Sequence, residues 1–100
     1  MIRGSTPTHV FRLPISTELI KALRITYVQK QKTVLEKTEQ DVTMDGTTIS
    51  LRLTQEETLA FNAECRVKIQ LKVLTVNEEV LASRITEVFV EQVLNEEVLE

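Results

Sequence analysis

Two side chains of this sequence have the reactivity that catalysis and metal binding most often use, His9 and Cys65. Histidine titrates near neutral pH and binds metals, while a cysteine thiolate is a nucleophile. Each residue type occurs once among the 100 residues. A zinc site needs three or four such ligands, and a nucleophile needs a nearby base. We therefore expect His9 to be a surface or strand-edge residue, and Cys65 to be a small half-buried apolar residue rather than a reactive thiol.

The remaining polar residues also lack a catalytic arrangement. None of the serines stands in a nucleophile-elbow sequence. Asp41, Asp45 and Gly46 fall short of a calcium loop, which needs closely spaced carboxylates. Three pairs of glutamates are adjacent in sequence and should point apart as solubilising surface groups: Glu56-Glu57, Glu78-Glu79 and Glu96-Glu97. The sequence predicts no enzyme, no cofactor and no metal site.

Composition favours one folded domain. Apolar residues make up 42% of the chain and charged residues 27%, which is ordinary for a globular protein. The net charge of −3 argues against general nucleic-acid binding. No stretch is long enough to cross a membrane, and the first residues lack the apolar core of a signal peptide. We expect synthesis in the cytoplasm and no membrane contact.

Alternating apolar and polar residues predict β-strands rather than helices. The clearest strand is 66–73, in which Val67, Ile69, Leu71 and Val73 face one way. Similar alternation predicts strands at 48–53, 22–28 and 8–13, with Tyr27 facing the core. The segment 84–90 fits both a strand and a helix, and its β-branched residues favour a strand. For the segment 91–100 the pattern does not distinguish a short helix from an irregular tail.

The segments between these strands contain residues typical of turns and helix caps. Asp45-Gly46 predicts a two-residue hairpin before the strand 48–53. The turns at 29–32 and 77–78 have no glycine, so we expect longer or type I turns there. Ser16 to Ile20 and Thr54 to Leu59 predict single helical turns that cross between sheets, the second with a capping box from Thr54 to Glu57. Leu19 and Leu59 should close the two ends of the core.

The second half of the chain repeats the plan of the first. Arg12 recurs as Arg52 after 40 residues, and Ile25 as Ile69 after 44. Further matches are the Ser16 to Leu19 turn with Glu56 to Leu59, Val34–Leu35 with Val80–Leu81, and Val42 with Val88. Two such halves predict an all-β fold, an antiparallel β-sandwich of about six to eight strands in which equivalent strands pair. We expect an N-terminal arm at 1–7, the sandwich at 8–94 and an acidic tail at 95–100.

Two surface features are candidates for partner binding. One is a basic stripe on outward strand faces, formed by Arg12, Arg24, Arg52, Arg66, Lys68 and Lys72, whose alternative is a solvated face balanced by Glu36 and other acids. The other is the last strand, where Val88, Phe89 and Val90 are apolar on both faces. A central strand would explain this and is the preferred interpretation. An edge strand would instead be a site for pairing with another chain.

Several segments resemble a known group of proteins. They are Gly4 to Phe11, Leu53 to Phe61, Val67 to Gln70, and Leu81 to Ser83. The chain resembles small uncharacterised proteins of phages and prophages of Gram-positive (Firmicutes) bacteria, and more loosely the N-terminal β-sandwich domains of phage baseplate proteins. The resemblance implies a structural or adaptor role, association with the virion and no cofactor or catalytic residues.

The expected function is therefore a non-enzymatic phage or prophage structural protein that acts through protein–protein contacts. Its partners would be other phage structural proteins or a second copy of itself, with no nucleic acid and no membrane. The expected binding residues are Val88, Phe89, Val90, Arg66, Lys68 and Lys72, with the N-terminal arm and the acidic tail as further contact surfaces. A ligand- or carbohydrate-binding β-sandwich module is the alternative.

Overall fold

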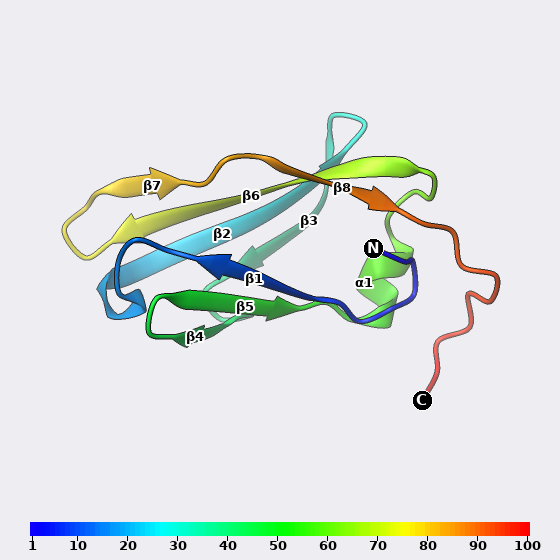
Figure 1. Ribbon diagram of the computed structural model, residues 1–100, viewed down its shortest axis with the longest axis horizontal. Helices are drawn as coiled ribbons and strands as arrows, with labels where there is room; N and C mark the ends of the chain where they lie inside the picture. Colours follow the sequence, from blue (N-terminus) through cyan, green and yellow to red (C-terminus); the bar gives the residue numbers. More distant parts are fainter.

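The structure, a computed structural model that describes all residues 1–100, is an antiparallel β-sandwich of eight strands (Figure 1). A three-stranded sheet has the order β1-β5-β4, and it packs on a five-stranded sheet in which β3, β2, β6 and β7 follow one another. Strand β8 pairs with β6 beyond the end of β7, on the same side. The predicted fold class is confirmed. The elements run in the order β1 (Thr8–Arg12), η1 (Thr17–Leu19), β2 (Ile20–Gln29), β3 (Lys32–Thr38), β4 (Thr43–Asp45), β5 (Thr48–Arg52), α1 (Gln55–Leu59), β6 (Cys65–Thr75), β7 (Val80–Ala82) and β8 (Thr86–Val90).

The strand register confirms that equivalent strands of the two halves pair with each other. In the small sheet, Val10 of β1 lies opposite Ser50 of β5, its own equivalent 40 residues on. In the large sheet, Thr26 of β2 lies opposite Gln70 of β6, its equivalent 44 residues on. Each pair of strands is therefore centred on one residue and its repeat, as a two-fold axis across both sheets would produce.

The matches proposed for Val34–Leu35 and for Val42 are wrong. Leu35 lies opposite Tyr27, but Leu81 lies opposite Val73 and not opposite the equivalent of Tyr27. Val42 precedes β4, which pairs with β5 in the small sheet, whereas Val88 belongs to β8, which pairs with β6 in the large one. The first half uses one strand of seven residues, β3, where the second half uses two shorter strands.

Alternation along β2, β5 and β6 builds the core. Twelve buried apolar residues form one cluster, with the inward sides of these three strands supplying most of it: Leu23, Ile25, Tyr27, Ile49, Leu51, Leu53, Phe61, Val67, Ile69, Leu71, Val73 and Val90. Burial of this apolar surface is the main favourable contribution to folding. The aromatic residues Tyr27 and Phe61 lie side by side, with ring centroids 5.7 Å apart.

Two short helical turns carry the chain between the sheets, as predicted. Ser16 caps η1, and Thr54 with Glu57 forms the predicted capping box of α1. The expectation that Leu19 closes the core is wrong, because 42% of its surface is exposed. The buried residues of these turns are Thr17 and Thr58, whose hydroxyls donate to the carbonyl oxygens of Gly46 and Ser5.

The three hairpin turns agree with the predicted turn types to different extents. The predicted two-residue hairpin before β5 is present, but its turn residues are Gly46 and Thr47 rather than Asp45 and Gly46, because Asp45 pairs with Thr48 at the end of β4; Gly46 has φ of +60°. The turn after Val76 bonds Glu78 N–H to the Thr75 carbonyl, in keeping with a type I turn. The turn between β2 and β3 is shorter than predicted. Gln29 pairs with Lys32, and both residues between them have positive φ.

The chain ends lie near α1 (Figure 1). Ile2 forms a parallel bridge to Glu91, just past β8, and the Met1 ammonium donates to the carbonyl of Phe89. Past Glu91 the last residues form no helix or strand. They are held by an ion pair between Arg3 and Glu96 and by two hydrogen bonds between the Gln55 side chain and the backbone of Leu99.

Candidate functional site: the outer face of the five-stranded sheet

Strand β6 places three cations on the outer face of the large sheet. Its odd-numbered residues from Val67 to Val73 are buried, so the even-numbered residues point to solvent. Arg66, Lys68 and Lys72 are all exposed on that side, and we call these three residues the basic row. Residues two apart on a strand lie about 7 Å apart, so the row follows β6 along one line.

No side chain of the protein forms an ion pair with the basic row. The cations in the five ion pairs of the structure are Arg3, Lys21, Arg24 and Lys37, and none belongs to the basic row. Arg24 lies directly opposite Lys72 and is neutralised by Glu36 and Glu39, at 3.8 and 3.2 Å. The backbone N–H of Leu23, together with Arg24, holds the pKa of Glu39 below its ordinary value, so this carboxylate stays charged. Glu36, the balancing acid that the sequence analysis named, therefore pairs with Arg24 and not with the basic row.

The predicted stripe divides between two surfaces. Arg12 and Arg52 project from β1 and β5, whose opposite faces carry the core residues of the small sheet. They therefore lie on the other side of the sandwich from the basic row. The sequence repeat made Arg12 and Arg52 equivalent to each other, but it could not show that the two sheets turn their outer faces in opposite directions.

Strand β8 adds an exposed aromatic ring beside the basic row. Phe89 lies directly opposite Arg66, and Glu87 lies directly opposite Lys68. Phe89 is 42% exposed, whereas Val90 is fully buried and Val88 packs against the core. Of the six residues predicted to bind a partner, the structure therefore brings Phe89 and the basic row together on one face. Val88 and Val90 point to the other side of the strand.

The preferred interpretation of 84–90 as a central strand is wrong. Strand β8 pairs with β6 only, and its second side has no neighbouring strand apart from the bridge at Glu91. Its double-sided apolar pattern arises because Val88 and Val90 cover the core while Phe89 lies outside. Met1 and Arg3 make backbone hydrogen bonds with Glu91, so the N-terminal residues cover one end of this edge.

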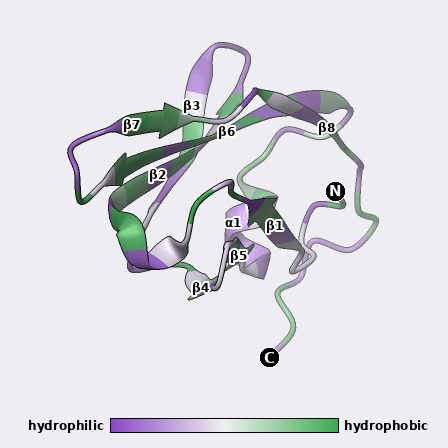
Figure 2. Cartoon of the chain, turned by 60° about the vertical axis from the view of Figure 1, so that its left-hand side comes forward, coloured by the Kyte–Doolittle hydropathy of each residue, from purple (hydrophilic) through white to green (hydrophobic).

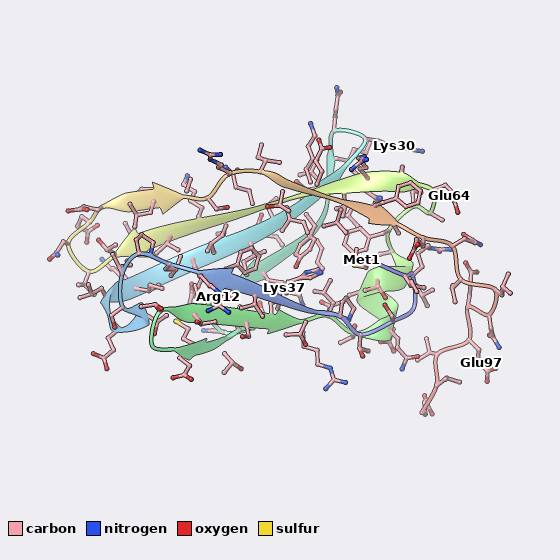
Figure 3. The ribbon with its side chains drawn as sticks, viewed as in Figure 1. Met1, Arg12, Lys30, Lys37, Glu64 and Glu97 are labelled. Atoms are coloured by element: carbon pink, nitrogen blue, oxygen red, sulfur yellow. The ribbon has the colours of Figure 1, made fainter.

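The hairpin between β2 and β3 borders the same face. A surface depression of about 430 Å³ is lined by Val28, Lys30, Gln31, Arg66, Lys68 and Glu87. Lys30 and Gln31 have φ of 50° and 66°, which is unusual for residues with long side chains. The hairpin is hydrophilic (Figure 2), and Lys30 stands at its tip (Figure 3). The depression thus has three cations and one acid at its rim.

A second polar group lies between the two sheets. His9 lies on an edge strand, as predicted, but its ring faces inward, where Nδ1 lies 2.7 Å from the Tyr27 hydroxyl. Burial and the N-terminal ammonium lower the pKa of His9 from 6.5, and burial raises the pKa of Tyr27. Both side chains are therefore neutral at pH 7, and their contact is a hydrogen bond between uncharged groups.

Lys37 forms an ion pair with Glu57 that joins β3 to α1, and Figure 3 shows Lys37 between the sheets. Sequence reasoning placed Glu57 among solubilising surface groups and did not select Lys37. One signal was present, because Leu35 and Lys37 are two residues apart and therefore share a face when this segment forms a strand. Cys65 is half-buried as predicted, and its sulfur contacts Gln29 and Asn62.

Comparison of the chain with protein-family models, curated proteins and solved structures finds no match in any of the three. No three side chains of His, Cys, Asp or Glu come together as a metal site would require. The structure also has no helix with the length and apolar character needed to cross a bilayer.

Proposed function

We propose that this protein is a non-enzymatic structural or adaptor component of a phage or prophage particle, with a baseplate-like or tail-like role. Its partners are other phage structural proteins or a second copy of itself. The observation that supports this proposal best is the outer face of the large sheet. That face presents three cations without ion partners beside an exposed phenylalanine, at the edge of the sheet.

Protein–protein contact suits this surface better than binding of a small ligand. Arginine and aromatic residues are enriched at protein interfaces, and Arg66 and Phe89 are direct neighbours here. Carbohydrate binding usually relies on exposed aromatic rings as stacking platforms. Tyr27 and Phe61 are buried and Phe11 is half-buried, which leaves Phe89 as the one exposed ring. The resemblance to phage proteins gives the biological setting of the proposal.

The direct test is to purify particles after prophage induction in the strain that encodes the chain and to quantify the protein by mass spectrometry. A structural component is recovered in a fixed ratio to the major tail proteins and stays bound during density-gradient purification. Expression of the chain in lysates that yield particles without it would refute the structural role.

Light scattering after size exclusion, over a wide concentration range, then identifies the type of contact. A ring or dimer of defined mass indicates contact between copies. A monomer at every concentration indicates an adaptor for a different protein.

A further inference from the structure

The geometry of the basic row matches an extended polypeptide. Arg66, Lys68 and Lys72 project from one strand at intervals of two and four residues. A second extended chain lying along β6 has the same rise per residue, about 3.3 Å. Carboxylates at positions i, i+2 and i+6 of such a chain would each meet one cation of the row. A helix with the same residues would carry its carboxylates on several sides.

We propose that the basic row docks an extended acidic segment of a partner protein, with carboxylates at alternate residues. This inference rests on the proposed function and adds the surface and the chemistry of the partner. Because the row has no internal ion partner, binding breaks no salt bridge within the protein. Each new pair forms at a partly exposed site and contributes modestly, so specificity depends on the number of pairs and their spacing.

The hairpin between β2 and β3 places a further cation beside the basic row. Two-residue hairpins with positive φ at both positions favour Asn-Gly, because Cβ crowds the backbone at positive φ, glycine has no Cβ, and asparagine tolerates this conformation. This hairpin has Lys30 and Gln31 instead. Positive φ costs an ordinary residue roughly 1 to 2 kcal/mol. The hairpin keeps a lysine at the rim of the depression that Arg66 and Lys68 also line.

Acids and apolar groups on the same face favour an acidic polypeptide over a nucleic acid. Glu87 lies opposite Lys68, and Glu36 and Glu39 accompany Arg24. These carboxylates would repel a continuous line of phosphates, and the whole chain has a net charge of −3. Separate carboxylates can instead alternate with side chains that contact Phe89 and Ile85, which are 42% and 56% exposed.

The test uses two fluorescent peptides of identical composition and fluorescence anisotropy as the readout. One peptide has glutamates at positions i, i+2 and i+6, and the other has the same glutamates side by side. The double variant Arg66→Gln/Lys68→Gln is compared with Arg12→Gln/Arg52→Gln, which removes the same charge from the opposite face. All four residues are exposed, so thermal unfolding should show both variants folded.

We expect the spaced peptide to bind more tightly than the clustered one, and its affinity to fall as salt increases. The Arg66→Gln/Lys68→Gln variant should weaken binding roughly threefold to twentyfold, while the opposite-face variant leaves it unchanged. Equal binding of both peptides, or equal binding of single-stranded DNA of the same charge, would overturn the proposal in favour of a general polyanion surface. Absence of peptide binding at millimolar concentration would also overturn it, without affecting the particle-composition test.

Hairpin variants separate strain from charge. Gln31→Gly should raise the melting temperature by relieving positive φ, and it should leave peptide affinity unchanged. Lys30→Asn/Gln31→Gly should be at least as stable but should bind the spaced peptide roughly twofold to fivefold more weakly, because one ammonium group is lost. Unchanged affinity in the double variant would exclude Lys30 from the docking surface.

Discussion

Replacement of Glu57 by glutamine measures the contribution of the ion pair between β3 and α1. Lys37 and Glu57 expose only 19% and 17% of their side chains. Glutamine keeps an oxygen that accepts the hydrogen bond from the Thr54 N–H, so the helix cap is retained. Exposed ion pairs contribute up to about 1 kcal/mol, and breaking a fully buried pair costs about 3 to 5 kcal/mol. We expect a cost of about 2 kcal/mol for this partly buried pair, seen as a melting temperature lower by about 8 °C or more.

The difference between wild type and Glu57→Gln should depend on pH. Burial raises the pKa of Glu57, but hydrogen bonds from the Lys37 ammonium and the Thr54 N–H outweigh burial and hold it below the ordinary value of 4.5. A carboxylate with a lowered pKa stabilises the folded state fully above its unfolded pKa, and this stabilisation is lost as pH falls through the folded pKa. The melting temperatures of wild type and Glu57→Gln should therefore become equal as pH falls below 4.5.

The exposed pair between Lys21 and Glu78 provides a matched control. These side chains are 55% and 67% exposed, at a distance of 2.8 Å. Glu78→Gln should cost about 0.5 kcal/mol or less. A double-mutant cycle with Lys37→Met isolates the coupling between Lys37 and Glu57. Equal costs at Glu57 and Glu78, or a Glu57→Gln effect that is constant from pH 7 to pH 3, would refute the argument from burial.

Three further substitutions test the core. Ile69→Asp places an unpaired charge at a position that is 4% exposed, and should leave the protein unfolded by circular dichroism; a folded variant with an unchanged melting point would mean that the inward face of β6 is misassigned. Tyr27→Phe removes the hydroxyl that contacts His9 and should cost about 1 kcal/mol in urea denaturation; no loss would mean that the contact contributes nothing. Thr58→Val leaves the Ser5 carbonyl without its donor and should cost about 1 to 2 kcal/mol by thermal unfolding, whereas Thr58→Ser should retain most of the stability.

Local patterns in the sequence predicted the centre of the fold. Val67 to Val73 alternate because one side of β6 is buried and the other is solvated, and the same cause produces the alternation around Ile25 and Leu51. The capping box at Thr54 could be predicted in the same way, since it depends on two residues three positions apart. Each of these signals is contained within a few neighbouring residues. The repeat added which strands pair, because a two-fold relation sets each strand beside its own equivalent.

Features that depend on contacts distant in sequence were not predictable in the same way. Whether β8 lies in the middle of a sheet or at its edge depends on what else pairs with β6. The Lys37–Glu57 pair joins two elements that look independently like surface segments. The tight turn at Lys30 was missed because its residues are poor formers of that turn, and the register of β2 with β3 requires it nevertheless.

The proposed docking surface lies where the second half of the chain departs from the first. Along β2, the single strand β3 pairs from Lys32 to Thr38, with one β-bulge between Thr33 and Leu35. Along β6, pairing with β7 ends near Ser83, whose hydroxyl accepts a hydrogen bond from the Leu71 N–H, and β8 then takes over at Ile69. This change of strand brings Phe89 and Glu87 opposite the basic row. If β7 had continued in its own register, in which Leu81 lies opposite Val73, Phe89 would lie opposite Cys65 instead of Arg66. The symmetric elements therefore account for the stability of the fold, and the departure from symmetry creates the face that we propose binds a partner.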